Sequence, residues 1–159
     1  MSEQMTELEI EERVQRAQEL FRQGFNCAQA VFASCADLFD IRDEALALRM
    51  AASFGGGIGR MRQTCGAACG MFMLEGLHSG SAVAGDREGK AANYEHVQQL
   101  AAAFKRQNGS LVCAELLAGT VAVPSDGPMP EERTETYYRK RPCIEMVSSA
   151  VRIFLENLT

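Results

Sequence analysis

Residues 55–70 read GGGIGRMRQTCGAACG and combine a glycine-rich stretch with the start of a predicted helix. The first five positions hold four glycines, which predicts an irregular turn. Thr64 is then a suitable N-cap for a helix over residues 65–77. The first half of this helix is rich in small residues, namely Gly66, Ala67, Ala68 and Gly70. Small residues let neighbouring backbones come close, so we expect this helix to pack tightly on its neighbours and to start beside an irregular turn.

Apolar residues recur with helical spacing along almost the whole chain. The predicted helices span residues 6–23, 27–39, 42–54, 65–77, 88–107, 111–117 and 143–157. We expect Asn26 to cap the second of them and Pro142 to open the last. Residues 119–141 hold three of the four prolines, and their one strand-like piece, residues 120–123, is too short to build a sheet. The sequence therefore predicts an all-α fold, a single helical bundle of six or seven helices with a long irregular connection before the last helix.

Composition limits the class of protein. The chain has 159 residues, which corresponds to one domain over residues 1–159, and its 23% charged and 47% hydrophobic residues are typical of a globular protein. The net charge of −5 argues against nucleic-acid binding, which needs a basic face. No apolar run approaches the ~20 residues of a membrane span, and the acidic start of the chain is the opposite of a signal peptide. We therefore expect a cytoplasmic protein.

The chain has six cysteines, more than a protein in a reducing compartment needs for packing. Four of them lie in the first turn of a predicted helix, namely Cys27, Cys65, Cys113 and Cys143. A helix N-terminus offers free N–H groups and a partial positive charge, which stabilise a thiolate and lower the cysteine pKa. The thiolate is the form that binds metals, exchanges disulfides and attacks electrophiles.

The topology predicts that these four cysteines meet. In an up-and-down bundle the second, fourth and sixth helices point the same way, which places three of the cysteines at one end. Residues 119–141 are long enough to bring Cys143 back to that end, because an extended chain covers about 3.3 Å per residue. We therefore predict one shared site, whose catalytic thiols or metal ligands are Cys27, Cys65, Cys113 and Cys143.

The two other cysteines fit this site less well. Cys35 lies about 12 Å farther along the helix axis than Cys27, so we expect a buried core thiol. Cys69 lies one turn past Cys65, and it either packs in the core or lines the same pocket one layer deeper.

Four convergent thiolates fit more than one kind of chemistry. They suit a zinc ion or an iron–sulfur cluster, and the same four fit reversible disulfides. The absence of a CxxC motif shifts the weight toward metal ligation. A third interpretation is a metal-binding or sensor module with no catalysis of its own. All three leave open whether the chain is an oxidoreductase, which electron-transfer or thiol partner it meets, and whether it forms an oligomer.

The glycine turn matches neither nucleotide-binding pattern, G-x-G-x-x-G nor G-x-x-x-x-G-K-[ST], and it follows a helix rather than a strand. We expect instead a close-approach turn beside the cysteines. The backbone positions that would contact a cofactor there are Gly56, Gly57, Gly59 and Gly66. Arg60 and Arg62 either supply positive charge for thiolates or for an anionic cluster, or are plain surface residues. The basic, aromatic residues 137–141 either form a solvated loop or cover the site.

In this order, these features resemble the C-GCAxxG-C-C family of redox-active proteins. The family pattern is an isolated cysteine, a glycine-rich turn that runs into a C-G-A-x-x-G helix start, and two later isolated cysteines. The matching features here are Cys27 in Phe25-Asn26-Cys27-Ala28, the run C-G-A-A-C-G at residues 65–70, Cys113 and Cys143. The resemblance covers residues 24–155 and implies a redox activity, without naming a substrate. Cys35 and Cys69 are not part of the pattern.

Overall fold

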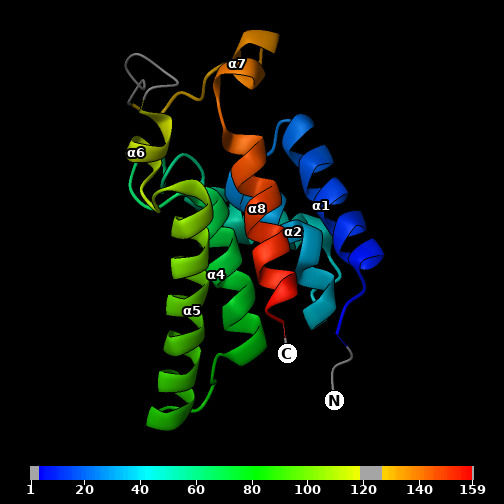
Figure 1. Cartoon of the computed structure of the whole chain (residues 1–159), viewed down its shortest axis with the longest axis vertical. Coiled ribbons are helices and arrows are strands. Elements are labelled where there is room, and N and C mark those ends of the chain that lie inside the picture. The colour runs from blue at the N-terminus through cyan, green and yellow to red at the C-terminus, as the bar shows by residue number, and fades with distance from the viewer. Residues whose placement is uncertain (1–3, 119–126, 159) are drawn as a thin grey trace.

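The computed structural model describes residues 4–118 and 127–158. Within these residues it has eight α-helices, two short 3-10 helices and no strand (Figure 1). The α-helices are α1 (Glu7–Arg22), α2 (Cys27–Cys35), α3 (Glu44–Ala51), α4 (Gly66–Ser79), α5 (Arg87–Asn108), α6 (Cys113–Leu117), α7 (Glu135–Lys140) and α8 (Cys143–Glu156). The prediction of an all-α fold is confirmed.

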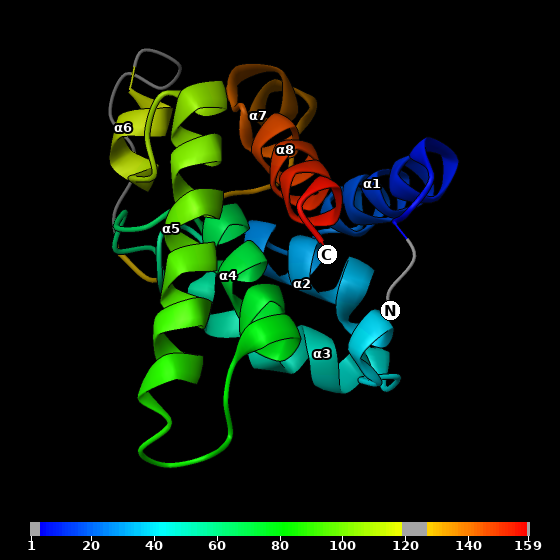
Figure 2. The ribbon, with the colours of Figure 1, turned by 60° about the horizontal axis from the view of Figure 1, so that its bottom comes forward.

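Helix α2 forms the centre of the bundle. It contacts α1, α3, α4 and α8, and in Figure 2 it lies between α3 and α8. Seven of its nine residues are buried, because small or apolar side chains cover nearly all of its surface. Asn26 caps it as predicted, in a reciprocal pair of hydrogen bonds with Gln29. The same two side chains donate to the carbonyls of Ala52 and Leu48, which ties the start of α2 to the end of α3.

Helices α2 and α4 lie in backbone contact. A Cβ atom added at Gly70 would lie 2.9 Å from the carbonyl oxygen of Ala28 and 2.9 Å from the Cβ of Val31. A Cβ added at Gly66 would lie 3.3 Å from the backbone nitrogen of Ala28 and 3.4 Å from the Cβ of Cys27. Close-packed interiors leave no room for such atoms. The predicted tight packing of this helix is therefore confirmed, and it depends on glycine.

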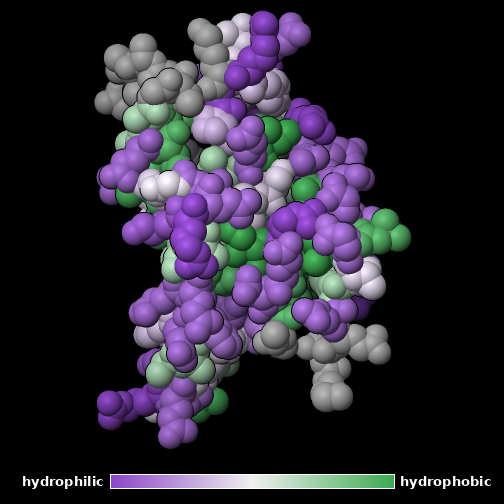
Figure 3. All heavy atoms as spheres, in the orientation of Figure 1, coloured by the Kyte–Doolittle hydropathy of each residue, from purple (hydrophilic) through white to green (hydrophobic). Residues whose placement is uncertain are grey.

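Helices α1, α5 and α8 cover this central pair. Helix α8 contacts α1, α2, α4 and α5, and its apolar stripe includes the buried Val147, Val151 and Phe154. Helix α1 turns Val14 and Leu20 into the same core. Figure 3 shows a largely hydrophilic outer face with hydrophobic patches between the helices. None of the helices among residues 4–118 and 127–158 is both long and apolar enough to cross a membrane.

Four helices, α1, α3, α4 and α6, start one or two residues later than predicted, and for α4 and α6 the cause is visible. Helix α4 begins at Gly66, and its N-cap is Cys65 rather than Thr64. Helix α6 begins at Cys113, with Val112 at its N-cap. The reason is an isolated antiparallel bridge between Thr64 and Val112, which holds both segments extended up to the helix starts.

The predicted irregular connection contains a helix. Helix α7 lies within residues 119–141, and the hydroxyl of Thr134 caps it by accepting from the N–H of Tyr137 at 3.1 Å. This short helix accounts for the difference from the six or seven helices predicted. The predicted helices over residues 27–39 and 42–54 each finish in a 3-10 turn, Ala36–Phe39 and Ala52–Phe54. The strand-like piece at 120–123 lies outside the described residues.

Replacement of Gly70 by alanine tests the contact between α2 and α4. The added methyl group has no space, so we expect Gly70→Ala to lower the free energy of unfolding by about 1–3 kcal/mol. The matched control is Gly76→Ala on the same helix, where nothing lies within 4 Å of the added Cβ. That change should raise the free energy of unfolding by about 0.5–1 kcal/mol, because alanine favours a helix. Urea unfolding followed by circular dichroism measures both, and effects of the same sign would contradict the contact.

Candidate functional site

The starts of α2, α4, α6 and α8 meet around one cavity of about 320 Å³. All eight predicted site residues line it, namely Cys27, Cys65, Cys113, Cys143, Gly56, Gly57, Gly59 and Gly66. Figure 1 shows α6, α7 and the start of α8 at the same end of the molecule. The chain therefore does bring Cys143 back to the end that holds the other three cysteines.

Cys27 and Cys143 are neighbours at the cavity wall. Each is the first residue of its helix, α2 and α8, and the interaction with the other thiol is the largest influence on the pKa of each. Both keep part of their surface exposed, whereas Cys65 and Cys113 are buried. These two residues, 116 positions apart in the chain, are thus the less buried pair of the four cavity cysteines.

Cys65 and Cys113 flank the bridge between Thr64 and Val112. The N–H of Cys65 donates to the carbonyl oxygen of Leu111 at 2.7 Å, and the N–H of Cys113 donates to that of Gln63 at 2.6 Å. In this pattern the two cysteines stand diagonally on one face of the bridge. Diagonal neighbours in an antiparallel pair are about 7–8 Å apart, whereas the Cβ atoms of a disulfide are about 3.5–4.5 Å apart. This pair would need backbone movement to form a disulfide.

The glycine turn is a left-handed coil of backbone. Every residue from 56 to 60 has φ between 56° and 75°, and Arg62 follows at 59°. A Cβ added at Gly57 would lie 2.7 Å from the Cβ of Cys113 and 2.7 Å from the Cα of Arg62. Glycine is therefore required there both for its conformation and for the close approach to a cysteine. Ile58, Arg60 and Arg62 adopt the same conformation with a side chain, which stores backbone strain beside the cavity.

In the part of the chain that the structure describes, the charged residues that line the cavity are four arginines and one carboxylate, namely Arg60, Arg62, Arg133, Arg141 and Glu131. Arg62 extends its Nη1 to 3.8 Å from the sulfur of Cys113. Arg60 donates to the carbonyls of Gly127 and Met129. Arg141 is buried, binds Glu131 and lies 4.9 Å from the ring centroid of Tyr137. Positive charge therefore surrounds the cysteines on several sides.

Arg133 anchors the segment before α7 to the corner between α1 and α2. Its two Nη atoms donate to the carbonyls of Phe21 and Phe25, each at 3.0 Å. Its guanidinium carbon lies 4.3 Å from the ring centroid of Phe21 and 5.0 Å from that of Tyr137. The sequence does not single out Arg133 as a site residue, because a charged side chain in the stretch Glu-Glu-Arg is typical of a solvent-exposed loop. Tyr137 and Arg141 belong to the segment for which covering the site was one of two interpretations, and both line the cavity.

The surroundings shift the pKa values of Cys143 and Cys27 in opposite directions. The hydrogen bond from Cys27 lowers the pKa of Cys143 to about 7, with help from the charges of Arg141, Arg133 and Arg62 and against the effect of burial. The same hydrogen bond, together with burial, raises the pKa of Cys27 well above its usual value. At neutral pH a large share of Cys143 is therefore thiolate, whereas Cys27 stays protonated.

The other two cysteines stay protonated at neutral pH. Burial raises the pKa of Cys65 to about 12, although the N–H groups of Ala68 and Ala67 oppose the shift. Burial also raises the pKa of Cys113, against a lowering contact with Arg62. At Cys65 and Cys113, the pKa-lowering effect expected from a helix N-terminus is therefore outweighed, because the cost of burying a charge exceeds the effect of the helix end.

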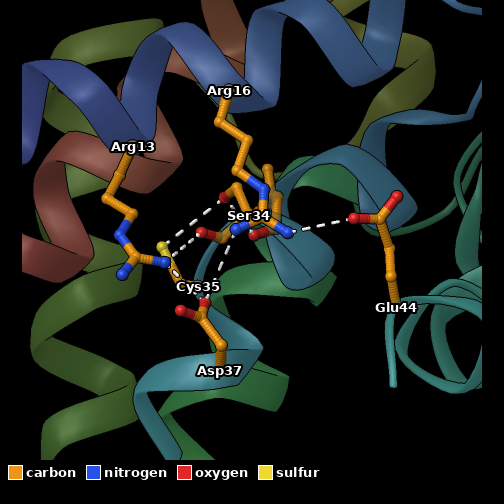
Figure 4. Close-up of polar contacts among 7 residues, drawn as sticks. Arg13, Arg16, Ser34, Cys35, Asp37 and Glu44 are labelled. Atoms are coloured by element: carbon orange, nitrogen blue, oxygen red, sulfur yellow. Dashed lines mark hydrogen bonds and ion pairs between the residues drawn. The ribbon is translucent and has the colours of Figure 1, made fainter. Parts of the chain in front are cut away.

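Cys35 and Cys69 lie outside the cavity lining. Cys35 is fully buried, hydrogen-bonds to Ser34 at 3.5 Å, and has its pKa raised to about 11 by burial. Figure 4 shows it beneath Arg13, which binds Asp37. Cys69 donates to the carbonyl of Thr64 at 3.8 Å, and burial raises its pKa to about 11. Cys35 is the core thiol that was predicted, and Cys69 packs in place rather than lining the cavity.

The described side chains do not form a site for a single metal ion. Among residues 4–118 and 127–158, no group of three or more histidine, cysteine, aspartate or glutamate side chains is placed to hold one. A zinc ion needs its cysteine sulfurs at roughly 2.3 Å from one point. No chemical step is therefore assigned to zinc or to an iron–sulfur cluster.

Comparison with known proteins gives one family. Residues 25–157 match the family described as "Putative redox-active protein (C_GCAxxG_C_C)". Neither the curated proteins nor the solved structures gave a match. The matched segment contains all four cavity cysteines and the glycine turn, and it covers most of the chain. On this match the chain belongs to the C_GCAxxG_C_C family of redox-active proteins.

Proposed function

We propose that the cavity carries out thiol–disulfide exchange, with Cys143 as the attacking thiolate and Cys27 as the thiol that resolves the mixed disulfide. The observation that carries this proposal is that Cys27 and Cys143, the first residues of α2 and α8, line the same cavity, where each thiol is the main influence on the pKa of the other. Membership of a redox-active family agrees with it. A contacting pair of one thiolate and one thiol is the arrangement that disulfide exchange needs.

The exchange proceeds in two displacements. The Cys143 thiolate attacks a sulfur of the substrate disulfide, a Cys143–substrate bond forms, and the first substrate thiolate leaves. Cys27 then gives up its proton and attacks the Cys143 sulfur, so that the Cys27–Cys143 disulfide forms and the second substrate thiolate leaves. The protein loses two electrons and the substrate disulfide gains them. A dithiol reductant of the cell would return the pair to its reduced form.

Cys65 and Cys113 complete the proposed site without exchanging electrons themselves. The charge on Cys143 helps to keep both of them protonated. Their diagonal placement favours two neutral thiols beside the Cys143 thiolate over a second disulfide. Metal ligation by all four cysteines would require their sulfurs to surround one point. Disulfide exchange needs only one interacting pair, Cys27 and Cys143, and it is therefore the favoured proposal.

Alkylation measures the acidity of Cys143 directly. We expect its reaction with iodoacetamide to be half-maximal near pH 7, because the thiolate forms as the pH rises through a pKa of about 7. Cys27→Ala removes the hydrogen bond, so the midpoint should move up toward the value of about 8.5 of an ordinary thiol. Peptide mass spectrometry resolves the rate at each cysteine.

Cys69→Ala is the matched control for this experiment. Its side chain lies outside the cavity lining, so the midpoint for Cys143 should stay unchanged. A Cys143 midpoint above pH 8 in the unmodified protein, or one that ignores Cys27→Ala, would contradict the assignment.

A redox titration separates disulfide exchange from metal ligation. Protein purified without oxygen should titrate against a glutathione couple as one two-electron dithiol. Cys27→Ser and Cys143→Ser should each abolish this transition, whereas Cys65→Ser should keep it at a shifted potential. Metal analysis of the same sample should find no stoichiometric zinc or iron. One metal ion or cluster per chain, lost in all four cysteine variants, would overturn the proposal in favour of ligation.

A further inference from the structure

Charge is distributed unevenly in this acidic chain. Its net charge is −5, yet among residues 4–118 and 127–158 four arginines and one carboxylate line the cavity. A recessed site lined by one sign of charge focuses the field and concentrates ligands of the opposite sign. The cavity is therefore built to receive an anion.

Arg133 is held rigidly and in a way that keeps its charge effective, whereas Arg60 and Arg141 share Glu131 as an ion-pair partner. The partners named above for Arg133 are two neutral carbonyls and aromatic rings, which orient its guanidinium without cancelling its charge. A guanidinium carries five N–H donors in a fixed fork, so two carbonyl contacts leave donors for a ligand. This fork matches the two oxygens of a carboxylate.

The size and the apolar wall of the cavity limit the ligand further. Its volume of about 320 Å³ is near the lower end of the roughly 300–1,000 Å³ of small-molecule sites. The apolar part of the lining includes Leu116, Leu117, Pro128, Pro130, Tyr137 and Met146. A short carbon chain fits such a wall, with a sulfur atom at one end for Cys143 and an acidic group at the other for the arginines.

We propose that the substrate is a low-molecular-weight disulfide whose two halves carry carboxylate groups. This inference rests on the thiol–disulfide function proposed above and specifies the substrate class of the same site. The arginines bind the carboxylates, and the substrate S–S bond meets Cys143. One such disulfide and the reduced Cys27–Cys143 pair then give two carboxylate thiols and the oxidised pair.

Three probes of nearly equal length test the charge preference: 3,3′-dithiodipropionate, 2-hydroxyethyl disulfide and cystamine are anionic, neutral and cationic. The rate at which each oxidises the fully reduced protein is divided by its rate with free N-acetylcysteine. We expect the anionic probe to exceed the neutral one by about tenfold and the cationic probe to be slowest. About 1 M salt should remove most of this difference, because the Debye length falls to about 3 Å.

Arg62→Gln and Arg106→Gln form a matched pair of variants. Both remove one positive charge, but Arg62 lines the cavity and Arg106 is exposed in the last turn of α5. Arg62→Gln should lower the ratio of the anionic rate to the neutral rate by about three- to tenfold. Because Arg62 also helps to lower the pKa of Cys143, the neutral rate serves as the measure of thiolate reactivity in each variant. Arg106→Gln should change neither rate, and Arg62→Lys should restore most of the anion preference.

The possible failures differ from one another. Oxidation of the Cys27–Cys143 pair by all three probes in the order seen with the free thiol would overturn the inference and leave the exchange function standing. Equal effects of Arg62→Gln and Arg106→Gln would also overturn it, since net charge alone would then explain the preference. If no probe oxidises the pair, the proposed function itself fails.

Discussion

The backbone contact between α2 and α4 is the constraint on which the site depends. Because Gly66 and Gly70 lack side chains, α4 lies directly on α2, and the Cβ of Cys27 comes within contact distance of Gly66. The same approach sets the start of α4, and so Cys65, beside the start of α2. The glycine turn makes the corresponding contact with α6 at Gly57 and Cys113. Glycines thus fix the positions of three cysteines, and α8 brings the fourth.

This packing buries the cysteines and so disfavours their thiolate forms. Residues of the connection before α8 supply positive charge that stabilises one thiolate, that of Cys143. Helix starts attract a thiolate, but burial penalises it more, so three of the four cavity cysteines are held as thiols. Only Cys143, which follows the connection, has a lowered pKa, because Cys27 donates to it and Arg133 and Arg141 lie nearby. Both arginines come from the segment that closes over the cavity. The segment that leads to Cys143 therefore also supplies the positive charges that lower the pKa of Cys143.

The sequence predicted the helices and the convergence of the cysteines better than it predicted their chemistry. Helical spacing and cap residues such as Asn26 are local signals, and shared helix polarity follows from them, so the meeting of Cys27, Cys65 and Cys113 could be foreseen. The contact of Cys27 with Cys143, and of Arg133 with the carbonyls of Phe21 and Phe25, joins segments more than 100 positions apart and depends on tertiary packing. Burial, which reverses the expected acidity of Cys65, is likewise invisible in a helix-start pattern. The glycines predicted a turn, but the left-handed φ of Ile58 and Arg60 could not be predicted, because side chains of these types rarely adopt that conformation.

Disulfide mapping tests the central claim most directly. The fully reduced protein is oxidised with a limiting amount of diamide, the remaining thiols are blocked at low pH, and the peptides are identified by mass spectrometry without reduction. The account predicts a Cys27–Cys143 linkage as the first and main intramolecular disulfide, because these two neighbouring thiols affect each other's pKa most strongly. A first linkage between Cys65 and Cys113, or oxidation that leaves Cys27 and Cys143 both free, would contradict it.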